Sequence, residues 1–294
     1  MADMRVPADL AATLAAAVEE GSLEGAARVL HVTQPAVTQR IQALERTVGQ
    51  VLLVRSRPVR ATAAGMAVIR FARQIEDLDR EVRVALDIES GQRATIAIAI
   101  NGDSLATWFL GPLASLAEEL SVSFHLHRAD EERTADLLTD GTVAAAVTTR
   151  PDPVPGCTVT RLGEMRYAAY ASRDFATRWF PDGASAMALE GAPVVDVDAD
   201  DALQTRYLVA KGADPAAPPR HRIPGSVEMI RAIELGMGWG VLPPELAARS
   251  DALVELGGPA VTVPLHWQQW RVSSGLLDRV AAGIAQRAGA LLAT

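Results

Sequence analysis

Residues 31–45 concentrate side chains that can read the edges of DNA bases. This stretch, HVTQPAVTQRIQALE, places polar residues on the outward side of an expected helix: Gln34, Thr38, Gln39 and Gln42, with Arg40 beside them. Glutamine can form two hydrogen bonds with adenine, and arginine can form two with guanine. The stretch is therefore typical of a helix that reads DNA.

The overall charge argues against a general nucleic-acid binder, because the 294 residues carry a net charge of −8. Residues 28–60 are different: they contain six arginines and a single acidic residue, Glu45. Attraction to DNA depends on charges within roughly 8–10 Å of the phosphates. A basic segment can therefore bind DNA although the rest of the chain is acidic.

Three short helices and a hairpin are expected to position these side chains. Apolar residues recur every four positions over residues 10–18 and mark the first helix, and residues 23–30 form the second. Thr33 can cap a third helix, and Gly49 is a suitable end for it. The β-prone VLLV and the arginine-rich RSRPVRAT that follow predict a hairpin over residues 51–62. This order is typical of a winged helix-turn-helix.

A long helix is predicted over residues 64–89. Its apolar residues recur at steps of three and four and form one seam: Val68, Ala72, Ile75, Leu78, Val82 and Leu86. A single domain rarely needs an isolated helix of this length, so we expect the seam to pair with a second copy of the chain. The alternative is that the helix lies on its own domain.

The remaining residues predict an α/β fold. Strand-like segments, many of them separated by helices, are expected at 94–100, 121–127, 143–148, 157–162, 166–171, 192–197, 205–210 and 239–243. The apolar run ATIAIAI suits a strand that is covered on both faces. About 200 residues with such connections could form two lobes, and ligands would bind beyond the carboxyl ends of the strands.

A dense pattern links two amino-terminal segments, GSLEGAARVLHVTQPAVTQRIQALERTVGQVLLVR (21–55) and RATAAG (60–65). It resembles the signature of the LysR-type transcriptional regulators. Further segments resemble the ArgP/LysG branch of this family: AIAINGDSLATWFL (97–110), EERTADLL (131–138), RWFPDG (178–183), APVVDVDADD (192–201) and GMGWGVLP (236–243). Members of that branch sense arginine and lysine and control a basic amino acid exporter. Residues 184–191 and 211–223 depart from the pattern.

The resemblance implies a domain organisation. We expect a winged helix-turn-helix DNA-binding domain at 1–63, a linker and dimerisation helix at 64–90, and an α/β effector-binding domain at 91–294. This last domain would have two lobes like a periplasmic binding protein, with lobe I at about 91–163 plus 268–294 and lobe II at about 164–267. Expected partners are double-stranded DNA, a lysine or arginine effector and a second copy of the chain, with a tetramer and RNA polymerase as further candidates. No cofactor is expected.

The family places the third helix in the major groove and the wing along the DNA backbone. For this chain, Gln34, Thr38, Gln39 and Arg40 would lie near base edges. Ser22, Thr33 and the wing arginines would contact phosphates or the minor groove. The complete expected set is Ser22, Thr33, Gln34, Pro35, Thr38, Gln39, Arg40, Gln42, Arg55, Arg57, Arg60 and Thr62.

The turn NGDS, residues 101–104, is the expected centre of the effector site. It follows a strand and precedes a helix, whose first N–H groups suit the α-carboxylate of an amino acid. Ser104 could add a hydroxyl group, and Asp103 could bind the α-amino group. The alternative is that Asp103 or Ser104 only caps the helix.

A cationic effector side chain requires a carboxylate elsewhere in the cleft. Glu131, Asp198 and Asp201 are the first choices, because they follow strands and lie within the resembling segments. The further effector-binding candidates are Asn101, Trp108, Thr148, Thr149 and Ser226.

Competing functions are an enzyme, a solute-binding module, or a regulator that senses another metabolite. The sequence has no evident Ser/His/Asp set, nucleophile elbow or phosphate loop, so we do not expect an enzyme. His125 and His127 have no third ligand at a convincing spacing, so no metal is expected. No apolar run approaches the roughly 20 residues of a membrane span, and the start MADMRVPADL lacks a signal peptide, so we expect a cytoplasmic protein.

Overall fold

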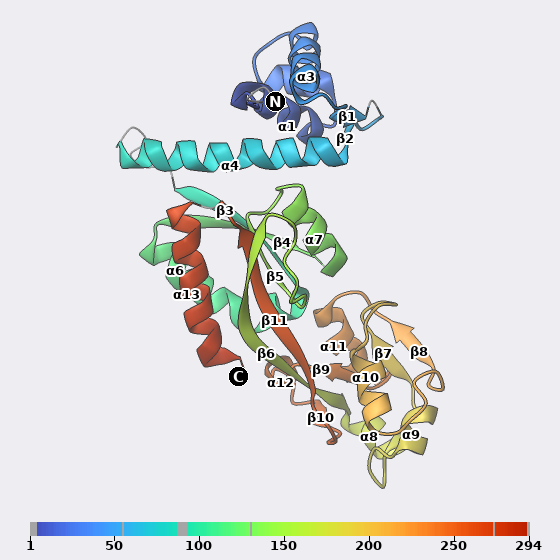
Figure 1. Cartoon of the computed structure of the whole chain (residues 1–294). Coiled ribbons are helices and arrows are strands. Elements are labelled where there is room, and N and C mark those ends of the chain that lie inside the picture. The colour runs from blue at the N-terminus through green and yellow to red at the C-terminus, as the bar shows by residue number, and fades with distance from the viewer. Residues whose placement is uncertain (1–4, 55, 87–92, 130, 273, 293–294) are drawn as a thin grey trace.

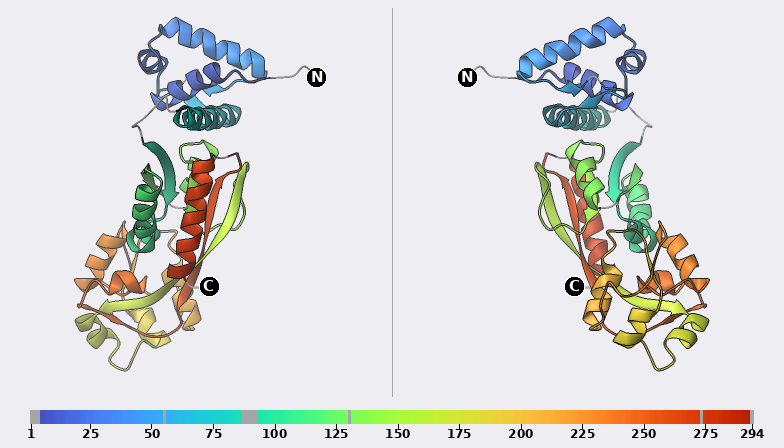
Figure 2. Two further views of the ribbon diagram at one scale, coloured as in Figure 1. Left: turned by 90° about the vertical axis from the view of Figure 1, so that its left-hand side faces the viewer. Right: turned by 90° about the vertical axis from the view of Figure 1, so that its right-hand side faces the viewer.

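The structure is a computed structural model that describes residues 5–54, 56–86, 93–129, 131–272 and 274–292. An amino-terminal helical unit lies beside one long helix, and an elongated α/β part follows (Figure 1). Figure 2 shows the helical unit at one end of the molecule and the strands of the α/β part running away from it.

The amino-terminal unit has the predicted winged helix-turn-helix order: α1 (Ala8–Glu19), α2 (Leu23–Val29), α3 (Gln34–Val48), β1 (Leu53–Val54) and β2 (Arg60–Ala61). Local signals set the ends of α3. Thr33 Oγ1 accepts a hydrogen bond from the N–H of Ala36 over 3.4 Å. Gly49 ends the helix in the left-handed conformation, with a φ of 73°. Both predicted helix ends are confirmed.

The helix α4 (Ala63–Ala85) confirms the long helix, and its two halves have different environments. Val68, Ile69 and Ala72 are buried in the same core as α1 and α3. Val82 and Leu86 are 55% and 63% exposed. The first half of the helix therefore lies on its own unit, and the second half leaves part of the apolar seam uncovered. Residues 87–89 of the predicted helix lie outside the described residues.

Arginines of α4 hold the helix against the α/β part. The Arg73 guanidinium donates to the carbonyl oxygen of Asp140 over 3.0 Å and pairs with Glu19 of α1 over 2.7 Å. Arg70 donates to the carbonyl oxygen of Pro155 over 3.1 Å. A Cβ added to Gly141 would lie 3.1 Å from Cα of Arg70, so the backbone approaches α4 closely at this position. One helix thus contacts both the amino-terminal unit and the α/β part.

The α/β part confirms the predicted fold class. Its elements, in order, are β3 (Ala94–Ile100), α5 (Gly102–Ser104), the π-helical turn η1 (Leu105–Phe109), α6 (Leu110–Glu119), β4 (Val122–Arg128), α7 (Glu131–Thr139), β5 (Ala145–Thr148), β6 (Cys157–Ser172), α8 (Arg173–Trp179), α9 (Ala186–Gly191), β7 (Val194–Asp196), α10 (Leu203–Ala210), β8 (Arg220–Arg222), α11 (Ser226–Glu234), β9 (Gly240–Leu242), α12 (Pro244–Ala247), β10 (Leu253–Glu255), β11 (Val261–Trp270) and α13 (Gly275–Leu291).

The strands β6 and β11 join two lobes. The sheet order is β10-β6-β11-β5-β3-β4, with β9 also paired to β6. Lobe I contains β3, β4 and β5, whereas lobe II contains α8 to α12 with β7 to β10 (Figure 1). β6 and β11 run antiparallel through both lobes, and their register shifts between Leu265 and His266. The boundaries expected at 163/164 and 267/268 thus fall within two continuous strands.

Two expectations about the strands were wrong, and one strand was not expected. Residues 205–210 belong to α10, because Gln204, Tyr207 and Leu208 share one buried side at helical spacing. The segments 157–162 and 166–171 form the single strand β6, which passes through Gly163 without a break. β11 was not predicted, since Pro264 lies inside it and proline normally marks an edge or a break.

Candidate DNA interface and effector site

The helix α3 separates an apolar side from a polar side, as expected. Val37, Ile41 and Leu44 are buried. Gln34, Pro35, Gln39 and Gln42 are exposed, whereas Thr38 and Arg40 are half-buried. The hydroxyl of Thr38 donates to the carbonyl oxygen of Gln34 over 3.1 Å, so it is partly engaged within the helix. The exposed amides have the reach and the chemistry to meet base edges.

The predicted phosphate-binding hydroxyls also stabilise local structure. Ser22 Oγ accepts from the N–H of Gly25 over 3.0 Å at the start of α2, as Thr33 does for α3. In these two caps the hydroxyl acts as an acceptor and keeps its O–H donor. Thr62 donates to the carbonyl oxygen of Val51 over 2.8 Å and accepts from Gly65 over 3.1 Å. Thr62 therefore fixes the wing to the start of α4.

Glu45 is a positioning residue that sequence reasoning missed. Its Oε1 accepts hydrogen bonds from the N–H groups of Leu52, over 2.9 Å, and Leu53, over 3.3 Å. The carboxylate therefore attaches the wing to α3. Arg57 and Arg60 are exposed on that wing, and Arg55 lies outside the described residues. A glutamate amid arginines was a visible signal, because it suggests a role other than phosphate contact.

Asp103 lies at the centre of a polar cluster that joins the two lobes. Its Oδ1 accepts from the Ser226 hydroxyl over 2.6 Å, and its Oδ2 accepts from the Tyr167 hydroxyl over 3.1 Å. Ser226 begins α11 in lobe II, whereas Asp103 belongs to the turn after β3 in lobe I. The structure thus brings two of the predicted effector residues together. Tyr167 was missed, because nothing in its local sequence indicates a partner 64 residues away.

Burial raises the pKa of Tyr167 well above its ordinary value, and the neighbouring charge and hydrogen bond of Asp103 raise it further. The phenol therefore stays protonated and acts as a hydrogen-bond donor to the carboxylate. The charge of Asp201 raises the pKa of Tyr167 in the same sense, so Asp201 acts on this region as well. The cluster is a negatively charged environment that suits a cationic group.

Asn101 caps the helix after β3, so the alternative role given to Asp103 and Ser104 was wrong in detail. Asn101 Oδ1 accepts from the N–H of Ser104 over 3.0 Å. Ser104 is completely buried, with its hydroxyl 3.9 Å from Sδ of Met165, and Trp108 is also buried. Both side chains are held in the protein interior beneath the turn.

Thr148 ends β5, and Thr149 directly follows the strand. Thr148 is buried opposite His266 of β11, and its Oγ1 accepts from the N–H of Arg150 over 3.2 Å. Thr149 is half-buried.

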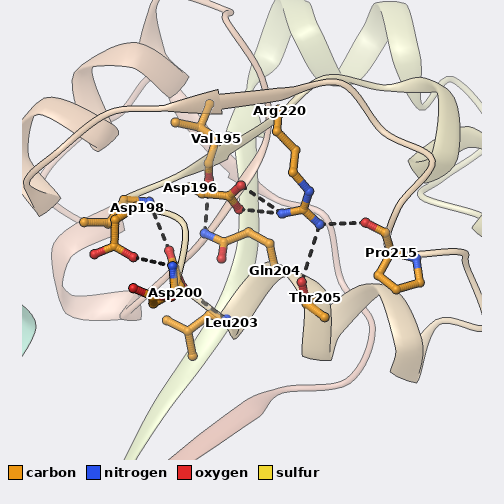
Figure 3. Close-up of polar contacts among 11 residues, drawn as sticks. Val195, Asp196, Asp198, Asp200, Leu203, Gln204, Thr205, Pro215 and Arg220 are labelled. Carbon is orange, nitrogen blue, oxygen red and sulfur yellow. Dashed lines mark hydrogen bonds and ion pairs between the residues drawn. The ribbon is translucent and has the colours of Figure 1, made fainter. Parts of the chain in front are cut away.

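The predicted acids after β7 mostly support their own loop (Figure 3). Asp198 is exposed and accepts from the N–H of Asp200 over 2.9 Å. Asp201 accepts from the N–H groups of Val197 and Leu203, each over 3.1 Å. Burial raises the pKa of Asp201, and these backbone hydrogen bonds oppose the shift. The third predicted acid, Glu131, begins α7, and its side chain lies outside the described residues.

Asp196 forms an ion pair with Arg220. Both of its carboxylate oxygens accept from Nη1 of Arg220, over 2.9 and 2.8 Å, and Nη2 donates to the carbonyl oxygen of Pro215 over 2.7 Å (Figure 3). Asp196 is almost fully buried. The pair fixes the loop between α10 and β8 onto β7, so Asp196 is not available to a ligand.

The rings of His125 and His127 are tilted by 46° to each other, with centroids 4.4 Å apart. Burial lowers the pKa of His127, and the charge of His125 lowers it further. Among the described residues, no group of three or more His, Cys, Asp or Glu side chains could hold a metal ion. In the same part of the chain, no helix is long and apolar enough to cross a membrane.

Comparison with known families identifies the class of protein. Residues 9–66 match the bacterial regulatory helix-turn-helix proteins of the lysR family, and residues 89–282 match the LysR substrate binding domain. The chain therefore belongs to the LysR family of transcriptional regulators, as its signature segments predicted.

The similarity to characterised members covers nearly the whole chain. The lysine export transcriptional regulatory protein LysG of Corynebacterium efficiens is 38% identical, over 96% of this chain and 98% of that protein. The crystal structure of ArgP from Mycobacterium tuberculosis has a TM-score of 0.89 and 39% identity, covering 97% and 98% of the two chains. Full-length LysG from Corynebacterium glutamicum with bound effector arginine has a TM-score of 0.81 and 32% identity, covering 98% and 100%.

Arg220→Ala is expected to destabilise lobe II, because it leaves the buried carboxylate of Asp196 without its partner. Loss of one member of a buried pair costs about 3 kcal/mol or more in the free energy of unfolding. Urea denaturation followed by tryptophan fluorescence measures this loss. Arg231→Ala, which removes an exposed pair with Glu234, serves as the control and should cost less than about 1 kcal/mol. Equal losses in the two variants would contradict the structural role given to Arg220.

Proposed function

We propose that this regulator responds to lysine or arginine and controls a gene for the export of a basic amino acid. The arginine bound to LysG of C. glutamicum is the observation that carries the proposal, because the similarity to that structure spans 98% of this chain. The name of the C. efficiens relative supports lysine export as the controlled process.

The cluster around Asp103 is our candidate for the effector's amino group. A carboxylate that already accepts two hydrogen bonds from hydroxyl groups can exchange one of them for an ammonium donor. Because Ser226 and Asp103 belong to different lobes, such an exchange would change a contact between the lobes. Asn101, Ser104, Trp108, Thr148 and Thr149 would shape the surroundings of the site rather than contact charge.

For the effector side chain we favour Asp201 over Asp198. Asp201 is partly buried, and burial penalises its charged form. A bound guanidinium or ammonium group would remove part of that penalty, whereas exposed Asp198 gains less. Glu131 stays a candidate of the same kind.

The amino-terminal unit from α1 to β2, which we call the DNA-reading unit, would act as one half of a homodimer. We propose 1–63 as the DNA-binding domain, 64–90 as the linker through which two copies pair, and 91–294 as the effector domain. A tetramer and contact with RNA polymerase are further proposals. The protein would work as a regulator rather than an enzyme, in the cytoplasm where bacterial DNA is transcribed.

Lysine or arginine should stabilise the purified protein. A ligand at 100 times its Kd adds about 2.7 kcal/mol to the free energy of unfolding, which corresponds to about 5 °C or more in Tm for a domain of roughly 200 residues. Thermal melts with the two basic amino acids, glutamate and leucine test this expectation. A shift with another metabolite, and none with lysine or arginine, would leave a LysR-type regulator with a different effector.

Gln39→Ala and Arg57→Ala should have different effects on DNA binding. Loss of Gln39 should cost about 1–3 kcal/mol of discrimination between specific and scrambled duplexes. Loss of Arg57 should weaken both duplexes equally and lower the slope of log affinity against log salt by about 0.9 per lost phosphate contact. Fluorescence anisotropy at several salt concentrations measures both effects. Indistinguishable losses would contradict the separate roles.

Val82→Glu should dissociate the dimer, because it would bury a carboxylate in the apolar seam of α4. Multi-angle light scattering should give the mass of one chain at concentrations where the wild type gives two. Val209→Glu is the matched control, since Val209 is 60% exposed on α10 and lies outside the seam. An unchanged mass for the Val82 variant would remove the seam as the dimer contact.

A further inference from the structure

Arg128 lies where the two lobes meet at the candidate effector site. It ends β4, and its guanidinium lies against the turn after β3: a Cβ added to Gly102 would be 3.1 Å from Nε and 3.2 Å from Nη2. The same Nη2 lies 3.7 Å from the Cβ position of Gly225, directly before α11. These are the two segments that the hydrogen bond between Asp103 and Ser226 connects.

The charge of Arg128 is not used within the part of the chain that the structure describes. No hydrogen bond or ion pair there involves its guanidinium, and the residue is exposed. The carboxylate of Glu228 also lies against the Cβ position of Gly225, so it is a nearby acid in lobe II. An unpaired guanidinium beside the Asp103 cluster, which suits an ammonium group, favours an anion bound between the lobes.

We propose that Arg128 binds the α-carboxylate of an amino acid effector while Asp103 binds its α-amino group. The inference rests on the proposed function for the class of effector. A guanidinium binds a carboxylate through two parallel N–H···O bonds. In an α-amino acid the two charged groups share one carbon, which matches neighbouring cationic and anionic partners. Gly102 leaves the guanidinium room to lie flat against the turn.

The consequence is selection for amino acids over amines. Agmatine and cadaverine carry the same side-chain cations as arginine and lysine but have no α-carboxylate. They would place only a hydrogen-bond donor or a methylene group near Arg128 and leave its charge unpaired. The sensor would therefore respond to the amino acid and not to its decarboxylation product.

Isothermal titration calorimetry of the full chain with arginine and agmatine tests the proposal. Arg128→Gln should weaken arginine binding about 10- to 100-fold, the usual value of a charge-assisted hydrogen bond, and should leave agmatine binding unchanged or tighter. Arg128→Lys keeps the positive charge but loses the planar guanidinium that can form two parallel hydrogen bonds. Its affinity for arginine should therefore fall between those of the wild type and Arg128→Gln. Thermal melts without ligand show that each variant folds.

Arg166→Gln is the matched control, because Arg166 is exposed on β6 next to Tyr167 and points to the opposite side of the strand. It should bind arginine as the wild type does. Arginine binding by Arg128→Gln equal to that of the wild type would overturn the proposal. So would equal losses for arginine and agmatine, which would make Arg128 a lobe-to-lobe partner of Glu228. A wild type that binds neither lysine nor arginine would instead overturn the proposed function, and this inference with it.

Discussion

The pairing of β6 with β11 is the constraint on which the α/β part depends. The two strands stay hydrogen-bonded from Cys157 and Trp270 in lobe I to Tyr167 and Val261 toward lobe II. Paired strands resist stretching and shear, so an irregularity in the pairing is the expected place for a change between the lobes. Such a place exists at Leu265 and His266, where the register shifts, opposite Gly163 with its φ of 143°. Asp103 makes its contacts to Tyr167 and Ser226 beyond this point, so a ligand at this proposed site would act on both sides of it.

The helix α4 connects the amino-terminal unit with the α/β part. Arg73 contacts the loop after α7 with one nitrogen and Glu19 with another. Glu76, on the same helix, has a raised pKa, first because of burial and then because of the charges of Glu19 and Asp77. The guanidinium of Arg73 therefore lies among carboxylates that would repel one another without it. A ligand can use this contact only if it binds two arrangements of the domains with different affinity.

Local sequence signals predicted the DNA-reading unit well, whereas the effector site depended on distant contacts. The caps Thr33 and Gly49 and the apolar side of α3 each need only neighbours within a turn or two, so spacing alone reveals them. Tyr167 and Ser226 reach Asp103 across 64 and 123 residues, and only Ser226 was expected, as a polar candidate on the other side of the cleft. Asp201 was predicted to hold the effector side chain, which stays a prediction, and its backbone hydrogen bonds were not visible in the sequence. The local signals for two further elements were poor. Pro264 is unusual inside a strand such as β11, and the run TRYLVA in α10 has a high β propensity. Burial in the tertiary structure decides both elements, and it cannot be read from the local sequence.

The charge distribution means that the affinity for DNA depends on how two amino-terminal units are paired. Screening limits the attraction of DNA to charges within about 8–10 Å of the phosphates, so the acidic α/β part adds nothing to the affinity of the basic wing and α3. One small unit with few phosphate contacts binds weakly. Two units joined through α4 would raise the effective concentration of the second, but only if their spacing matches the half-sites on the duplex. Arg70 and Arg73 attach α4 to the loops of lobe I, so in the proposed dimer a change in those loops would be passed to α4 and to the spacing of the two units. An effector would then change operator affinity without touching a residue that contacts DNA.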